Sequence, residues 1–392
     1  MNKKLIIVIV LILIFGLSGY FWVIKNTSSS KDSDQNTVSE KRQKQTQPDK
    51  IRLIASGDNL PHETVNAQAK TGNTYNYAQF FEPITQVFDS SDIAFCNQES
   101  PSAPGLSVSA YPTFNAPKEF AQDLSKVGCN VIGLANNHLN DKGQAGIDGT
   151  RGLWDEIKPL AVAGANRSAA EQNKVSYFEV KGVKFAFVAY SEISNSNPAQ
   201  SYSLNRFDEN LVKSQLNEAK TKADFVLVSA HWGTEYSPNA NPVQERWAKI
   251  FADNGADVVF GSGPHVLQPV KKLPRSGGGE TVVFYSLGNL LSSQLDIESL
   301  IGGLAVLDID VASKKIDSVG FFPTYMHYEW TAAEKAREDL LARKNLKIYP
   351  LEQSAEPLAK SQNNTSVQAQ TDRITELLNK FTAVKILKLS DF

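Results

Sequence analysis

The chain has 392 residues, of which 41% are hydrophobic and 21% are charged, so it can bury a large core in one or two domains. Its 40 Lys and Arg nearly balance its 42 Asp and Glu, so it has no basic excess of the kind that indicates a nucleic-acid partner. Two cysteines are too few for a disulfide scaffold or a cysteine-rich zinc or iron–sulfur site. Composition therefore excludes disordered, fibrous and disulfide-scaffold proteins.

The amino-terminal segment is strongly apolar. Residues 5–24, LIIVIVLILIFGLSGYFWVI, carry no charge and would span about 30 Å as a helix, which matches the hydrocarbon core of a bilayer. Trp22 and Lys25 resemble a membrane-interface exit, and neither a small-residue cleavage site nor a lipoprotein-type cysteine follows. We predict an uncleaved signal anchor, a transmembrane helix within residues 1–25, which makes the membrane a partner.

The orientation of this span is predicted from its short tail. Basic residues occur on both sides of it, so charge alone does not favour export. A short amino-terminal tail usually stays inside while a long folded domain is translocated. We therefore expect a single-pass protein of the cell membrane whose folded domain is extracellular. Residues 26–50 are polar and contain a single valine, which predicts a flexible linker.

From Ile51 onward, short β-type apolar runs alternate with amphipathic stretches, which predicts an α/β domain. The runs cover residues 51–56, 92–97, 130–136, 184–191, 224–231, 257–262 and 281–289. Helices are expected at 76–90, 118–128 and 241–255, and a further strand pair within 304–323. Residues 353–372 lose the apolar period, which predicts a linker before a short helix near 373–381. We assign residues 51–327 to the main domain and 328–392 to a carboxyl-terminal extension.

Side chains capable of metal binding or catalysis occur where the apolar runs end. They are Asp58, Glu99, Asn136, Asn137, His138, His231 and His265. The carboxyl ends of parallel strands meet at one edge of a sheet, so we expect these side chains to converge. Oxygen and imidazole ligands without thiolates suit Mn²⁺, Zn²⁺ or Mg²⁺. One or two such ions can activate a phosphoester for hydrolysis, and a nearby imidazole can protonate the leaving group.

Each of these residues also has an ordinary structural interpretation. An Asp or Asn after a strand is most often a helix cap or turn former, and a lone His is often a buried structural residue. The combination favours a site, because three of only five histidines end or follow an apolar run. His62 is a candidate fourth, and His327 is either a peripheral substrate contact or structural. Trp232 and Tyr236 either line the crevice or pack in the core.

The two cysteines are expected to be free thiols. Cys96 ends one predicted strand and Cys129 begins another. If those strands are parallel neighbours, the two sulfurs lie near opposite ends, too far apart for a disulfide.

Five long segments occur in one order along residues 51–327: SGDNLPHE, FCNQESP, LANNHLNDKGQAGI, SAHWGTEYSPNANPVQERWAKIFADNGADVVFGSGPHVLQPV and FYSLGN. In these segments the sequence resembles the CapA family of capsule and poly-γ-glutamate synthesis proteins, itself similar to calcineurin-like metallophosphatases. The resemblance implies a metallophosphatase-like sandwich of two facing sheets flanked by helices (α-β-β-α). It also implies an anionic surface polymer or a phosphoester as substrate, and membrane-bound polymer synthase subunits as partners.

The resemblance also implies a role for individual residues. The implied metal ligands are Asp58, Asn137, His231 and His265, with Glu99 as a bridging carboxylate. His138 would be the general acid or transition-state stabiliser, and Asp141 would hold it through a carboxylate–imidazole hydrogen bond. A surface turn carboxylate is the other interpretation of Asp141.

Two departures from the pattern bear on activity. Asp58 is followed by Asn59 and Leu60 instead of the phosphatases' Asp-x-His, which leaves His62 as a candidate substitute ligand. Gly263 stands where related sequences commonly have a second His. A site with fewer ligands binds a second ion weakly or keeps the scaffold without turnover. A metal-dependent phosphoesterase is the leading hypothesis; a non-catalytic polymer-binding or export factor and a peptidase-like hydrolase of the γ-linked polymer are the alternatives.

Overall fold

The computed structural model describes residues 49–198, 200–276 and 278–392, and Pro48–Phe392 form one compact unit. The predicted anchor, residues 5–24, and nearly all of the predicted linker, residues 26–50, lie outside the described residues and stay predictions. Among the residues that are described, no helix has the length and apolar character needed to cross a membrane.

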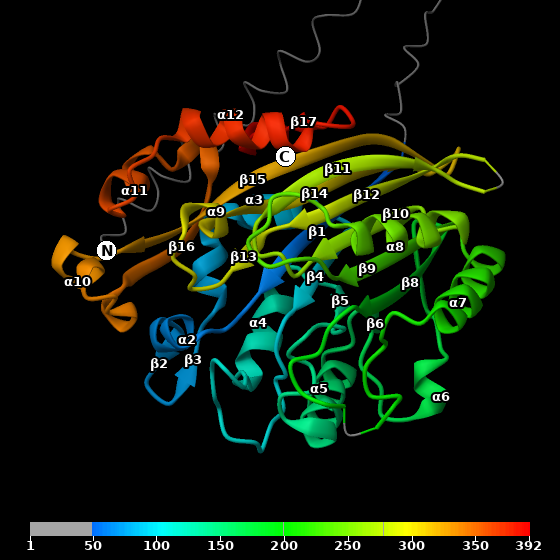
Figure 1. The fold of residues 1–392 in the computed structure, drawn as a ribbon, viewed down its shortest axis with the longest axis horizontal. Coiled ribbons are helices and arrows are strands. Elements are labelled where there is room, and N and C mark those ends of the chain that lie inside the picture. Colours follow the sequence, from blue (N-terminus) through cyan, green and yellow to red (C-terminus); the bar gives the residue numbers. More distant parts are fainter. Residues whose placement is uncertain (1–48, 199, 277) are drawn as a thin grey trace, which may run out of the picture. The chain divides into compact units, whose positions relative to one another are not determined.

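The larger sheet has nine strands in the order β16-β15-β14-β1-β4-β5-β6, with β13 also pairing β1 and β17 also pairing β15 (Figure 1). Strands β1, β4, β5 and β6 are parallel, whereas β14, β15 and β16 each run antiparallel to the preceding neighbour. The bounds are β1 Lys50–Asn59, β4 Ile93–Gln98, β5 Val131–Gly133, β6 Ala161–Ala163, β13 Asn289–Leu291, β14 Ile301–Asp310, β15 Lys315–Glu329, β16 Lys344–Pro350 and β17 Lys385–Ile386.

The smaller sheet has six strands in the order β11-β12-β10-β9-β8-β7, of which β8, β9, β10 and β12 are parallel. Antiparallel strands β7 and β11 close its two edges. The bounds are β7 Ser176–Val180, β8 Val183–Ser191, β9 Phe225–His231, β10 Val258–Ser262, β11 Leu267–Pro274 and β12 Glu280–Leu287, and a separate small hairpin joins β2 Lys70–Thr71 to β3 Thr74–Tyr75.

The predicted helices at 118–128 and 241–255 are present. The segment 76–90 instead forms a 3₁₀ helix, η1, followed by the short α3, and Pro83 lies inside η1, where it cannot donate a backbone hydrogen bond. The helices are α2 Glu63–Ala69, η1 Ala78–Ile84, α3 Thr85–Asp89, α4 Lys118–Val127, α5 Gly143–Ile157, α6 Ala169–Gln172, α7 Glu209–Lys222, α8 Pro242–Asp253, α9 Ile297–Leu300, α10 Ala332–Ala336, η2 Leu340–Ala342, η3 Leu351–Gln353, α11 Ala355–Lys360, α12 Val367–Leu378 and η4 Leu389–Asp391.

The two sheets pack face to face. Along β9, Phe225 and Leu227 belong to the core shared with the larger sheet, whereas Val226 and Val228 belong to a second core with α7 and α8. This two-residue alternation is that of a strand buried on both faces. Helices α4 and α5 contribute buried residues to the first core. The predicted two-sheet sandwich flanked by helices is therefore the observed architecture.

The carboxyl-terminal residues are not a separate extension. The predicted boundary at 327 falls inside β15, and β16 and β17 both pair with that strand. The predicted linker 353–372 contains α11 and the first turns of α12. Only one side of α12 is buried, by Gln370, Ile374 and Leu378. Because Gln370 is polar, the helical spacing of apolar residues is too weak in the sequence to predict the full helix.

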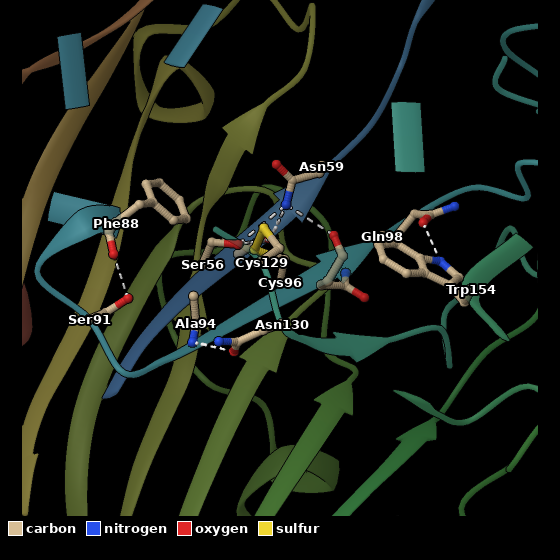
Figure 2. The surroundings of a disulfide bond; sticks show 12 residues. Ser56, Asn59, Phe88, Ser91, Ala94, Cys96, Gln98, Cys129, Asn130 and Trp154 are labelled. Atoms are coloured by element: carbon tan, nitrogen blue, oxygen red, sulfur yellow. Dashed lines mark hydrogen bonds between the residues drawn. A yellow bond between two sulfur atoms is a disulfide. The ribbon is translucent and has the colours of Figure 1, made fainter. Parts of the chain in front are cut away.

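The prediction of free thiols is wrong, because Cys96 and Cys129 form a disulfide with a Cα–Cα distance of 5.8 Å (Figure 2). Strands β4 and β5 are parallel neighbours, as assumed. However, Cys129 precedes β5, in the turn after α4 where Gly128 has φ 124°. Its backbone N–H still donates to Leu124 O at 3.0 Å. The turn therefore places Cys129 against β4 instead of extending the line of β5.

Candidate metal centre

The predicted site residues come from the ends of strands in both sheets. Asp58 lies near the end of β1, Glu99 directly follows β4, and Asn137 follows β5 in the nine-stranded sheet. His231 is the last residue of β9, and His265 follows β10, in the six-stranded sheet. All five are almost fully buried.

The distances bring two carboxylates and two imidazoles together. His265 Nδ1 lies 3.1 Å from Asp58 Oδ2, and His265 Nε2 lies 3.9 Å from Glu99 Oε1. His231 Nε2 lies 3.8 Å from the same Glu99 oxygen, and its Nδ1 lies 4.0 Å from Asp58 Oδ1. Asp58, Glu99 and His265 each offer a ligand atom within 4.8 Å of the others. Four of the five predicted ligands therefore lie together, and they come from two facing sheets instead of from one edge of a single sheet as the sequence predicts.

The donor set fits a divalent cation. Among the predicted ligands, four buried atoms have no hydrogen-bond partner in the described part of the chain: Glu99 Oε1 and Oε2, Asn137 Oδ1 and His231 Nε2. A buried polar atom without a partner costs about 1–3 kcal/mol, so native proteins rarely leave several on neighbouring elements. Each of these atoms is of a type that ligates Mn²⁺, Zn²⁺ or Mg²⁺. Coordination of a metal would satisfy them.

The electrostatics of the cluster favour the binding of a cation. Burial, together with the neighbouring Asp58, raises the pKa of Glu99 well above its ordinary value. Burial also opposes ionisation of Asp58, but the hydrogen bond and charge of His265 outweigh it and lower the pKa of Asp58 to about 2. Burial lowers the pKa of His231 to about 4, which keeps this imidazole neutral, the form that binds metals.

Three polar residues that the sequence analysis did not single out orient the predicted ligands. Ser262 Oγ lies 3.0 Å from His231 Nδ1, which leaves His231 Nε2 free to act as a ligand. Asn97 Nδ2 donates to Asp58 Oδ1 at 2.8 Å and to Ser262 Oγ at 3.3 Å. Asn289 Oδ1 lies 3.1 Å from His265 Nδ1. The sequence could have pointed to these three residues, because each lies inside one of the segments that carry the family resemblance.

Gly263 lies at the cluster itself. Its backbone N–H donates to Asp58 Oδ2 at 3.1 Å. A Cβ at this position would lie 3.3 Å from His231 Nε2 and 2.8 Å from Trp232 O, and the φ of 106° disfavours any side chain. The backbone at position 263 therefore does not accommodate the second His that related sequences commonly have there.

The predicted catalytic pair is formed. His138 Nδ1 lies 2.8 Å from Asp141 Oδ2, and the same oxygen accepts a hydrogen bond from Phe114 N at 2.8 Å. The Asp141 side chain is fully buried, which excludes the surface-turn interpretation. His138 Nε2 has no carboxylate partner among the described residues and lies 3.4 Å from Asn195 Nδ2.

The other two histidines lie outside this cluster. His62 Nδ1 accepts from Ser293 N at 3.3 Å, and its ring packs edge-on against Phe114. Burial lowers the pKa of His62 to about 3, so this imidazole is neutral. His62 is not among the three residues whose ligand atoms lie within 4.8 Å of one another. His327 is buried on β15 and its Nε2 lies 3.2 Å from Glu329 Oε1, which favours the structural interpretation.

Comparison with known families agrees with these motifs. The family model described as "Bacterial capsule synthesis protein PGA_cap" matches residues 52–294. The chain belongs to this family.

Two curated relatives carry related descriptions. "PGA biosynthesis protein CapA" of Bacillus subtilis (strain 168) is 31% identical over 221 residues, which cover 55% of this chain and 57% of the relative. "Capsule biosynthesis protein CapA" of Bacillus anthracis is 32% identical over 190 residues, which cover 46% of this chain and 44% of the relative. The chain thus spans about half the length of the curated relatives it matches.

Similar solved structures include a novel phosphatase from Mycoplasma pneumoniae, with a TM-score of 0.44 and 14% identity over 71% of this chain and 94% of that one. Another is the calcineurin-like phosphoesterase YfkN from Bacillus subtilis, with a TM-score of 0.40 and 11% identity over 82% of this chain and 98% of that one. These values mark a remote likeness, and the metal centre rests on its own geometry.

Proposed function

We propose that the protein is a membrane-anchored, metal-dependent phosphoesterase-type hydrolase of the metallophosphatase class, acting in the synthesis or assembly of a capsule or poly-γ-glutamate surface polymer. The observation that carries the hydrolase proposal is the convergence of buried, partnerless ligand atoms beside an imidazole–carboxylate pair. One or two ions of Mn²⁺, Zn²⁺ or Mg²⁺ would be held by Asp58, Glu99, Asn137, His231 and His265. The biological role rests on the family.

Different residues of the site have different roles in the proposed hydrolysis. A bound divalent ion supplies Lewis-acid stabilisation of charge on the phosphoryl oxygens and lowers the pKa of a bound water. Asp141 holds the His138 imidazole by its Nδ1, which leaves Nε2 to donate a proton to the leaving oxygen. Burial of Glu99 and its neighbours keeps bulk water out, which strengthens these interactions.

The proposed location outside the cell has two supports. Residues 5–24 are apolar enough for a membrane anchor. The buried Cys96–Cys129 disulfide is of the kind that forms and persists in oxidising compartments, and is rare in cytosolic proteins. The membrane and polymer synthase subunits remain proposed partners.

Metal content and turnover test the hydrolase. The full chain, purified in detergent, is assayed for bound metal and for hydrolysis of p-nitrophenyl phosphate. We expect Glu99→Gln to lose both metal and turnover, and His138→Ala to retain metal while turnover falls by about 10²–10⁴-fold. A wild-type protein that binds no divalent metal, or turnover that survives both substitutions, would overturn the proposal.

A non-catalytic polymer-binding or export factor is the second candidate, and Gly263 favours it, because a second imidazole is missing there. This function predicts metal-dependent binding of poly-γ-glutamate without hydrolysis of any phosphoester. A peptidase-like hydrolase would instead shorten the polymer, which size-exclusion chromatography of the incubated polymer would detect.

A further inference from the structure

A cavity of about 550 Å³ adjoins the metal centre, and its lining includes His62, Tyr111, Tyr236, Gln294, Ser299 and Leu341. The Tyr236 and His265 rings lie 6.1 Å apart between centroids. Gln294 Nε2 donates to the Tyr236 hydroxyl at 3.2 Å, and Gln294 Oε1 accepts from Asn289 at 2.7 Å. Because Asn289 also contacts His265, side chains of the cavity lining lie next to the metal centre.

The rim of this cavity concentrates exposed apolar surface. Eleven large hydrophobic side chains are exposed on the described residues, and five of them line this one cavity. They are Tyr111 (75% exposed), Tyr236 (53%), Leu295 (39%), Leu340 (41%) and Leu341 (55%). Exposed apolar side chains that gather at a concave site mark a binding surface, whereas single ones need no explanation.

The charges of the lining favour an uncharged occupant over a polyanion. Glu63 and Asp296 are the charged residues among those described around the cavity, and neither Lys nor Arg lines it. An anionic polymer segment would be repelled by both carboxylates.

We propose that this cavity binds the uncharged, apolar portion of the substrate, an aryl or long-chain alkyl group, while the phosphate of the same molecule reaches the metal centre. The phosphate half of this inference rests on the proposed hydrolase function. The volume lies within the range of about 300–1,000 Å³ typical of small-molecule sites. The cavity thereby selects an amphipathic phosphoester over a polyanion.

Occupancy is tested without catalysis by photolabelling the full chain with benzophenone, a neutral aryl probe, and mapping adducts by mass spectrometry. We expect adducts in segments 293–299 and 340–341. The double variant Leu340→Ser, Leu341→Ser should reduce them at least five-fold in 293–299. Phe381→Ser, a matched control that removes an equally exposed side chain outside the cavity lining, should not. Adducts absent from both segments, or unchanged in 293–299 in the double variant, overturn the inference.

Selectivity is tested by comparing 2-naphthyl phosphate with ethyl phosphate. The Leu340, Leu341 double variant should lower the ratio of their kcat/KM values about ten-fold, and Phe381→Ser should leave it unchanged. An unaltered ratio in the double variant overturns the inference even if the enzyme is active. If the cavity is labelled but the protein hydrolyses neither ester, the proposed hydrolase function is overturned and the proposed apolar binding site is kept.

Discussion

The two sheets contribute different chemistry to one crevice. Ends of the nine-stranded sheet carry the proposed oxygen ligands Asp58, Glu99 and Asn137, whereas ends of the six-stranded sheet carry the proposed imidazole ligands His231 and His265. Neither sheet alone presents a mixed oxygen and nitrogen set. The metal centre is therefore a property of the interface between the sheets, and changes in either half should have distinguishable effects.

The largest effect on metal affinity is expected at Glu99, whose two buried carboxylate oxygens both lack a hydrogen-bond partner. Glu99→Leu should reduce metal affinity by more than the roughly 10–100-fold typical of losing an outer-shell partner. It should also raise the free energy of unfolding of the metal-free protein by about 1–2 kcal/mol, since two buried oxygens without partners disappear. Denaturant unfolding in EDTA and metal analysis measure the two effects.

His231→Leu is the matched change in the other sheet. It should gain less stability than Glu99→Leu, because it removes one partnerless atom and also breaks the contact with Ser262. Equal gains in both variants would contradict the proposed difference between the two halves.

The disulfide lies only in the oxygen-donating half, and its removal should change stability more than metal affinity. Replacing Cys96 and Cys129 together by Ala frees a loop with a sequence separation of 33, which should cost about 3–4 kcal/mol of unfolding free energy. Metal affinity should also fall, because β4 and β5 carry Glu99 and Asn137 at their ends. Denaturant curves with unchanged midpoints in the double variant would refute this prediction.

Asn97→Ala, which removes a contact between the two sheets, should lower metal affinity less than Glu99→Leu does. Its amide joins Asp58 of one sheet to Ser262 of the other, so metal affinity should fall about 10–100-fold. Calorimetric titration with Mn²⁺ measures this. Asn130→Ala is the control, because Asn130 bonds to Ala94 and Asp92 at the opposite end of β4 and should lower stability without changing affinity.

The smallest effect is expected for Ser262→Ala. The hydroxyl fixes the orientation of the His231 ring but ligates nothing in the proposed centre, so affinity should fall by about ten-fold or less. The same titration tests it. A loss as large as that of Glu99→Leu would show that Ser262 is itself a ligand.

Local patterns sufficed for the central strands and for most of the predicted ligands, but β6, β7, β11 and β16 lie outside the predicted runs. Asp58, Glu99, His231 and His265 could be named because each ends or follows an apolar run. That the strand ends of two different sheets meet was decided by the packing of the sheets. The disulfide could not, since the turn at Gly128 moves Cys129 out of the line of β5. Nor could the helix α12, because its buried stripe includes the polar Gln370.

The sequence by itself determined the alternation of strands and helices, the strand-end residues and the family. Tertiary structure alone decided that Asn97 would meet Ser262, 165 residues away, and that Gly263 would lie against His231. It also decided that five exposed apolar side chains would surround one cavity. A period of two or 3.6 residues encodes which face of an element is buried, but not which distant element packs against it.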